Sequence, residues 1–181
     1  MSPETFATAR LDAHRGGVAD VDFVVAMFTD PRVTATLGGP RTREQVRELV
    51  ARWDAHWDAR GFGPWILNDA ATGAPVGWLL LHTTQTGGPN SVELGWSIAA
   101  NRWGEGLASE AGGGATKIAF TDVGLDALVT FTLGNNAASR RVMEKVGFRY
   151  DCDVEHAGLP HVLYRLDRAT WETNEMGERD G

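Results

Sequence analysis

Cysteine is almost absent from this chain of 181 residues, in which Cys152 is the only one. A single cysteine excludes a disulfide within the chain and also a cysteine-based metal cluster. The five histidines show no HExxH spacing, so the signature of a zinc-dependent hydrolase is missing as well. We therefore expect no metal cofactor, and a reducing compartment, the cytoplasm, is the expected location.

Positive charge and long apolar runs are also scarce. The chain has 17 Lys and Arg against 24 Asp and Glu, a formal net charge of -7, whereas a nucleic-acid-binding protein usually presents a basic surface. No apolar run approaches the roughly 18 residues of a membrane span. The first five residues lack the basic and apolar regions of a signal peptide. We expect a protein that binds neither nucleic acid nor membranes.

The composition that remains is that of an ordinary folded domain, with 43% hydrophobic residues, 23% charged residues and a mean hydropathy of -0.24. The length suits one domain with a full core, and the chain contains neither an internal repeat nor a linker. We expect a single α+β domain over residues 1–171. The residues from 172 to 181 are polar, and we expect a disordered tail there.

Hydrophobic periodicity and turn residues predict the order of helices and strands. Thr42 and Gln45 form a capping box, and the helix that it opens should end at Gly61. Three strand-like runs follow with short turns between them, which favours an antiparallel meander. The predicted elements are strand 6–11, helices 20–28 and 42–60, strands 64–68, 75–82 and 91–98, a helix from about 106 to 122, strand 127–132, helix 137–146 and strands 148–155 and 161–166.

The segment from Asn101 to Ala111 joins a predicted strand to a predicted helix through a turn that contains Gly104 and Gly106. Such a junction points backbone N–H groups and the positive end of a helix dipole into one concavity. The pattern indicates an anion site, most simply for phosphates, although an ordinary glycine-containing connection has the same pattern. The helix that follows contains three successive glycines, 112 to 114. Each costs on the order of 1 kcal/mol relative to alanine, so we expect close packing of the backbone against a neighbouring element.

Five short motifs occur in matching order along these elements. They are Asp30 to Val33 with Leu37 to Gly39, Gly61 to Trp65, Glu93 to Trp96 followed by Trp103 to Glu110, Asn136 to Ser139, and Glu144 to Phe148. In these motifs and in element order, over about residues 5 to 167, the chain resembles the GNAT superfamily of acyl-CoA-dependent N-acetyltransferases. It looks most like the branch that includes the ribosomal-protein N-terminal alanine acetyltransferases.

The resemblance implies a fold and an activity. The fold is a mixed, mostly antiparallel sheet of six to seven strands with splayed central strands, flanked by about four helices. The activity is transfer of an acetyl group from acetyl-CoA, as co-substrate, to a primary amine of a protein N-terminus or a small molecule. The amine attacks directly in a ternary complex, without an acyl-enzyme. The family often dimerises, so a homodimer is also an expectation.

The resemblance also implies a cofactor site. The loop from Trp103 to Ala108 would cradle the CoA pyrophosphate through backbone N–H groups, with Trp103 in place of the usual first polar residue. Arg102 would add a charge-assisted phosphate contact, or it is a solvated loop arginine. Backbone groups near Ile98 would bond the pantetheine arm and offer an N–H to the thioester oxygen. The implied cofactor-binding residues are Trp96, Ser97, Ile98, Arg102, Trp103, Gly104, Glu105, Gly106, Leu107, Ala108, Asn136 and Ser139.

The reaction needs a base, because free amines are mostly protonated at pH 7. Glu93 is the first candidate, and a structural carboxylate is the alternative reading; Asp151 and Glu155 are weaker candidates. Many family members carry a tyrosine as the acid in the last helix, where this chain has Met143. The resemblance leaves Ser139 to hydrogen-bond the sulfur, unless Ser139 is only a helix-surface residue.

The acceptor side is less specified. In the family it is formed by the first helices, here with the loop from residue 30 to 43, and by the last hairpin around residues 156 to 161. Two alternative functions stay open at this point. One is a transferase that uses a bulkier acyl-CoA such as succinyl-CoA. The other is a CoA-binding sensor or interaction module without catalysis, since Met143 replaces tyrosine and three glycines interrupt the cofactor helix.

Overall fold

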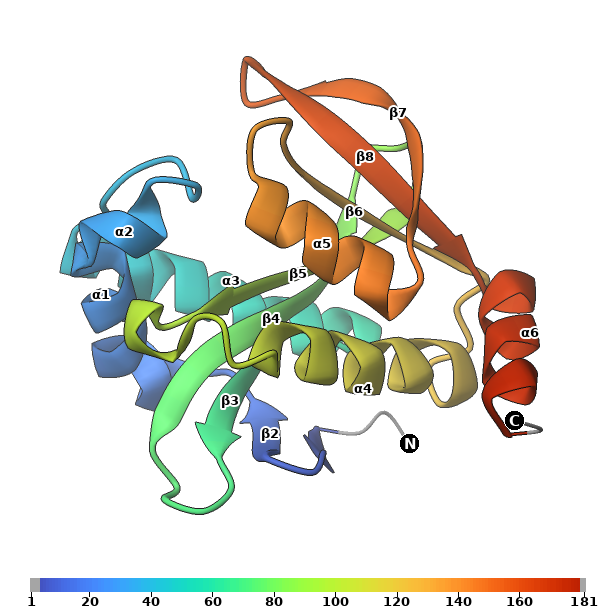
Figure 1. Ribbon diagram of the computed structural model, residues 1–181. Coiled ribbons are helices and arrows are strands. Elements are labelled where there is room, and N and C mark those ends of the chain that lie inside the picture. The colour runs from blue at the N-terminus through green and yellow to red at the C-terminus, as the bar shows by residue number, and fades with distance from the viewer. Residues whose placement is uncertain (1–3, 180–181) are drawn as a thin grey trace.

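The computed structural model describes residues 4–179, and it forms one mixed sheet with helices on both faces (Figure 1). Residues 1–3, at the start of the segment predicted to lack a signal peptide, lie outside the described residues, as do residues 180–181 of the predicted tail. None of the helices in residues 4–179 combines the length and apolarity that crossing a membrane requires. The same residues contain no group of three or more metal-binding side chains arranged around a common point.

The sheet has eight strands in the order β1-β2-β3-β4-β5-β6-β8-β7. All neighbouring pairs are antiparallel except β5 and β6, which are parallel. The strands are β1 (Thr5–Ala7), β2 (Leu11–Arg15), β3 (Trp65–Asp69), β4 (Pro75–Thr84), β5 (Ser91–Ile98), β6 (Ala127–Leu133), β7 (Arg149–His156) and β8 (Leu159–Asp167). The predicted meander is therefore confirmed as β3-β4-β5.

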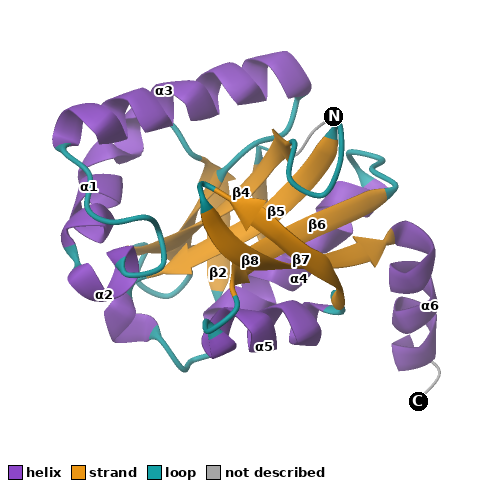
Figure 2. Ribbon diagram, turned by 90° about the horizontal axis from the view of Figure 1, so that it is seen from above, coloured by secondary structure: helices purple, strands orange, loops and turns teal. Residues whose placement is uncertain are grey.

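Helices cover the two faces of the sheet separately (Figure 2). On one face lie α1 (Val21–Thr29), α2 (Pro31–Thr34) and α3 (Arg43–Arg60), whose apolar residues pack with Ile66 and Trp78 of the sheet. On the other face lie α4 (Leu107–Thr121) and α5 (Ala137–Val146), and α6 (Arg168–Arg179) lies at the end of β8. The Thr42/Gln45 capping box and the left-handed Gly61 at the end of α3 are both present, as predicted.

Two segments differ from the sequence prediction. The single strand predicted from residue 6 to 11 is a hairpin, β1 and β2, that turns at Thr8 to Arg10. The segment from 172, expected to be disordered, continues α6 to Arg179. Trp171 packs on Phe120 with ring centroids 5.4 Å apart, and Nε of Arg168 donates to the Leu125 carbonyl at 2.8 Å. These contacts dock α6. The hairpin makes the sheet larger than predicted, and α2 and α6 make the set of helices larger.

The three glycines of α4 show the expected close packing at two positions. A Cβ at Gly112 would lie 3.0 Å from Val146 of α5, and a Cβ at Gly114 would lie 3.0 Å from the Phe6 ring of β1. Nothing lies within 4 Å of a Cβ at Gly113. Close approach of α5 and β1 thus accounts for Gly112 and Gly114 but not for Gly113.

We predict opposite effects for alanine at Gly77 and at Gly113. A Cβ at Gly77 of β4 would lie 2.4 Å from the Ser97 carbonyl oxygen of β5, a backbone atom. Gly77→Ala should therefore lower the free energy of unfolding by about 3 kcal/mol. Gly113→Ala, in open space within a helix, should raise it by about 0.5–1 kcal/mol. Urea unfolding of both variants checks this, and an unchanged midpoint for Gly77→Ala would contradict the packing of β4 on β5.

The parallel strands β5 and β6 pair at only one position, Glu93 with Val129. Beyond this point they diverge toward their carboxyl ends (Figure 1). This confirms the predicted splay of the central strands. The edge of β5 that faces β6 consequently has no strand partner from Leu94 to Ile98 within the described part of the chain.

Candidate active site

A pocket of about 540 Å³ lies at the open end of the splay. Its walls come from the end of β5, the loop before α4, the first turn of α4, one side of α5, and α2 with the residues that follow it. Of the residues predicted to bind the cofactor, all except Glu105 line this pocket. They are Trp96, Ser97, Ile98, Arg102, Trp103, Gly104, Gly106, Leu107, Ala108, Asn136 and Ser139. Elements separated by more than 100 residues in the chain thus meet around one cavity.

The loop before α4 is built to leave backbone N–H groups open. Gly104 and Gly106 adopt φ of 83° and 81°, in the left-handed region that favours glycine. Gly106 is the N-cap residue and has no side chain to cap the helix. The first intrahelical bond runs from the Glu110 N–H to the Gly106 carbonyl at 3.1 Å, so the N–H groups of residues 107 to 109 precede it. An anion fits such a helix start.

The Trp103 side chain links this loop to strand β5. Its indole N–H donates to the Ile98 carbonyl at 2.6 Å, and the residue is 54% exposed. The bond ties the loop to the last residue of β5. Trp103 therefore stands as an exposed ring on the pocket wall rather than in the core.

At the start of α5, Asn136 acts as the N-cap. Its side-chain oxygen accepts from the Ser139 N–H at 3.2 Å, and its Nδ2 donates to the Thr132 hydroxyl at 3.0 Å. Asn136 thus caps the start of α5. The Ser139 hydroxyl lines the pocket and makes no hydrogen bond to another residue in the range 4–179, so it is available to a ligand.

The charge on the pocket wall is of one sign. Four positive side chains line it, Arg32, Arg102, Arg141 and Lys145, and none of the described lining residues is Asp or Glu. This contrasts with the net charge of -7 for the whole chain. Arg32 was not among the predicted site residues. It sits in the short helix α2, where Asp30 caps the helix and holds the guanidinium through Nε at 3.0 Å and Nη2 at 2.7 Å.

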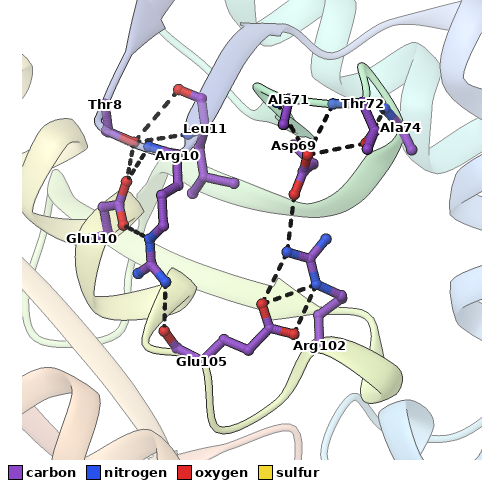
Figure 3. Close-up of polar contacts among 10 residues, drawn as sticks. All are labelled: Thr8, Arg10, Leu11, Asp69, Ala71, Thr72, Ala74, Arg102, Glu105 and Glu110. Carbon is purple, nitrogen blue, oxygen red and sulfur yellow. Dashed lines mark hydrogen bonds and ion pairs between the residues drawn. The ribbon is translucent and has the colours of Figure 1, made fainter.

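Glu105 is the exception among the predicted cofactor residues, because it does not line the pocket. Its carboxylate accepts from Arg102 Nε at 2.8 Å, and Arg102 Nη2 also donates to Asp69 at 3.0 Å (Figure 3). These partners raise the pKa of Arg102 and lower the pKa of Asp69 and of Glu105. Arg102 is thus neither a free phosphate ligand nor a solvated arginine, but an ion-paired cation on the pocket wall.

A second network braces the other side of the loop. The Glu110 carboxylate accepts from the Thr8 hydroxyl at 2.6 Å, the Arg10 N–H at 2.8 Å and Arg10 Nε at 2.6 Å (Figure 3). Arg10 Nη1 in turn donates to the Glu105 carbonyl at 2.9 Å. The turn between β1 and β2 therefore holds the loop and α4 together. These partners lie about a hundred positions apart in the chain, so no local pattern indicates them.

Glu93 lies at the base of the splay and not on the pocket wall. Its side chain is only 13% exposed, and burial raises its pKa to about 7. It pairs across the strands with His82 of β4, and the distance from Glu93 Oε2 to His82 Nδ1 is 3.6 Å. A carboxylate with a pKa near 7 suits a general base at neutral pH.

The face of the sheet that carries Glu93 also carries several aromatic and imidazole rings. His56 of α3 lies 6.2 Å from His82 between ring centroids. At the far side, Phe131 of β6 lies 4.7 Å from His156 and 5.9 Å from His161. The first helices and the last hairpin thus both contribute to this side, where the acceptor was expected.

The weaker candidates stand apart from this arrangement. Asp151 and Glu155 lie exposed on the edge strand β7, and Asp151 is paired with Arg165 at 3.1 Å. Met143 is buried in the core. Neither exposed carboxylate lies beside Glu93 or on the wall of the pocket.

Comparisons with known proteins agree with this geometry. The chain is 29% identical over 185 residues, covering 92% of this chain and 77% of the relative, to an FsC-acetyl coenzyme A-N(2)-transacetylase of Aspergillus fumigatus. An acetyltransferase structure from Agrobacterium tumefaciens superposes with a TM-score of 0.78 at 25% identity, covering 92% of this chain and 95% of the other.

The fold also occurs in aminoglycoside acetyltransferase AAC(6')-Ib, solved in complex with coenzyme A. That structure gives a TM-score of 0.78 at 17% identity and covers 91% of this chain and 99% of its own. The family profile described as an acetyltransferase (GNAT) domain matches residues 15–149. This chain therefore belongs to the GNAT family of acetyltransferases and is an acyltransferase.

Proposed function

We propose that the protein transfers an acetyl group from acetyl-CoA to a primary amine, by direct attack in a ternary complex. One observation carries the proposal. Among the residues that the structure describes, four cations and no carboxylate line the pocket at the β5–β6 splay, in a chain of net charge -7, and the pocket opens onto an uncapped helix start. Such a site suits a ligand that carries several phosphates at one end.

The residues divide between the two ends of that ligand. The N–H groups of residues 107 to 109 and the cations Arg141 and Lys145 suit its phosphates. The free edge of β5 from Leu94 to Ile98 suits the amide groups of its pantetheine arm. In this arrangement Arg102 contributes charge while it remains bonded to Asp69 and Glu105.

The chemistry follows from the groups at the base of the splay. Glu93 takes a proton from the acceptor ammonium, directly or through water, because only the neutral amine attacks a thioester. A backbone N–H near Ile98 stabilises the negative charge that develops on the thioester oxygen. The Ser139 hydroxyl hydrogen-bonds the departing thiolate, which takes up the second proton of the attacking nitrogen through water and leaves as the thiol of CoA. Met143 takes no part, because its thioether cannot donate a proton.

The acceptor is an amine of a protein N-terminus or of a small molecule. The ribosomal-protein branch that the motifs resemble favours the first. The fungal relative, whose name describes an N(2)-transacetylase, favours the second.

The test is a thiol-release assay with acetyl-CoA and a panel of amines and peptides, run beside calorimetric binding of CoA. We expect micromolar CoA binding and turnover with at least one amine. CoA binding without turnover by any amine would contradict the enzyme assignment and favour a sensor. Turnover with succinyl-CoA in preference to acetyl-CoA would contradict the assigned acyl group.

We predict that Glu110→Gln raises the KM for acetyl-CoA about tenfold and leaves kcat within about twofold. The carboxylate holds Thr8 and Arg10, which brace the phosphate loop, and hydrogen bonds to charged groups contribute about 1.5–3 kcal/mol, reduced here because Arg10 is half exposed. Steady-state kinetics check it, with the exposed Glu172→Gln of α6 as the matched control. An unchanged KM would show that the brace does not position the loop.

A further inference from the structure

One buried polar atom on the acceptor side has no partner. The Nδ1 atom of His82 is buried without a hydrogen bond within the described residues, and it faces Glu93 Oε2 at 3.6 Å. The two residues are directly paired across β4 and β5. Buried ring nitrogens are normally satisfied, since an unmade bond costs about 1–3 kcal/mol. In the proposed acetyl transfer, Glu93 accepts the proton and His82 Nδ1 has no role.

The neighbouring His56 is held in one neutral form. Its Nδ1 donates to the Phe62 carbonyl at 2.8 Å, and its Nε2 accepts from the Thr83 N–H at 3.2 Å. A carbonyl only accepts and an amide N–H only donates, so both nitrogens are assigned and neither can take a further proton. His56 therefore covers His82 with a ring that carries no charge. The His82 side chain remains 35% exposed, so part of its ring reaches solvent.

We propose that His82 is a positioning and proton-relay residue for Glu93, an inference that rests on the proposed acetyl transfer. The acceptor ammonium gives a proton to the Glu93 carboxylate, which becomes the carboxylic acid. The Glu93 acid passes this proton to the lone pair on His82 Nδ1 and is again a carboxylate. His82 then releases the proton on Nε2 to water, which leaves a neutral ring protonated on Nδ1. Rotation of the ring and proton exchange with water return that proton to Nε2 before the next turnover, so the cycle closes without another reactant.

Burial affects the charged forms of both members of the pair. Burial raises the pKa of Glu93 to about 7. Burial lowers the pKa of His82 below its usual 6.5, and a positive charge on His156 of β7 would add to this effect, whereas His56 is held neutral by its two hydrogen bonds and adds no charge. The charged and titratable neighbours of His82 are thus Glu93, His56 and His156. Since burial disfavours both the carboxylate form of Glu93 and the imidazolium form of His82, neither charged form holds the pair in one state.

The kinetic test uses His82→Gln and His82→Ala. We expect His82→Gln to lower kcat about tenfold with an unchanged KM for acetyl-CoA. Added imidazole should restore kcat of His82→Ala, while pyrazole, a ring of the same size but a far weaker base, should not. The control is His14→Gln, which removes another half-buried histidine paired with a carboxylate, at 3.0 Å from Asp20. Full activity of His82→Gln, or equal rescue by pyrazole, would overturn the relay.

A second measurement needs no acceptor. The imidazole C–H signals of His82 are followed by NMR against pH in the wild type and in Glu93→Gln. Loss of the carboxylate should shift the His82 titration to lower pH and leave that of His14 unchanged. A His82 titration that does not respond to Glu93→Gln overturns the relay alone. Absence of turnover by the wild type with every amine tested would instead overturn the proposed function together with the relay.

Discussion

Glu93→Gln should lower kcat by about 10²- to 10³-fold while the KM for acetyl-CoA stays within about twofold. The substitution keeps the shape of the side chain but removes the group that accepts the proton. Acetyl-CoA binding should not change, because Glu93 does not line the cationic pocket. Steady-state kinetics with a turned-over amine measure both constants.

The matched control for this prediction is Glu155→Gln. Glu155 is an exposed carboxylate on β7, and its removal should leave kcat unchanged. In the wild type, kcat should also rise as the pH increases through about 7, since Glu93 must lose its proton to act as a base. A wild-type rate for Glu93→Gln would remove Glu93 from the mechanism, and a large loss in Glu155→Gln would move the base to β7.

The same substitution should make the protein more stable at alkaline pH. The pKa of Glu93 is raised by burial from its ordinary value of 4.5 to about 7. The folded state therefore holds a proton that the unfolded state releases, and the wild type loses stability as the pH rises from about 4.5 through 7. The total loss is about 3 kcal/mol, and it is complete above pH 7. Glu93→Gln has no such loss.

Thermal and urea unfolding of the two proteins at pH 4.5 and at pH 8 measure this difference. We expect similar stability at pH 4.5 and, at pH 8, a melting temperature for Glu93→Gln that is higher by roughly 5–10 °C. Glu155→Gln should follow the wild type at both pH values. A difference between Glu93→Gln and wild type that does not depend on pH would mean that Glu93 is not held protonated by the fold.

A lower kcat and a higher stability at alkaline pH in Glu93→Gln would together show that Glu93 serves activity while it destabilises the fold. A buried carboxylate that is inactive would be expected to have a satisfied hydrogen-bond partner. Glu93 instead faces the orphan Nδ1 of His82 at 3.6 Å. Residues that lower the stability of the fold but are needed for activity are characteristic of functional sites.

Elements with strong local signals were predictable almost to the residue. Helix α3 has its capping box and left-handed Gly61, and helix α5 has its Asn136 cap and Gly147. Strand β5 runs over the predicted 91–98. In each case the stop and start signals lie within a few positions of the element itself, so the chain near it carries enough information.

Elements that depend on distant partners were not predictable in the same way. The β1–β2 hairpin exists because Thr8 and Arg10 bond Glu110, and α6 is docked because Trp171 packs on Phe120. The residues 172 to 179 are polar and look like a tail when read alone. The contacts that dock their helix come from Arg168 and Trp171 and need Leu125 and Phe120 in place.

The candidate site divides along the same line. The loop from Trp103 to Ala108 has two glycines and a helix start, which fit an anion site but also an ordinary connection, and the other motifs in matching order supply the resemblance to the family. The amino-acid order by itself therefore determined the family, the cofactor loop and the candidate base. The braces on that loop, the cation Arg32 and the pairing of His82 with Glu93 join positions that are far apart or belong to different strands. Only the tertiary structure decided these, since strand register and desolvation arise from packing and have no local pattern in the chain.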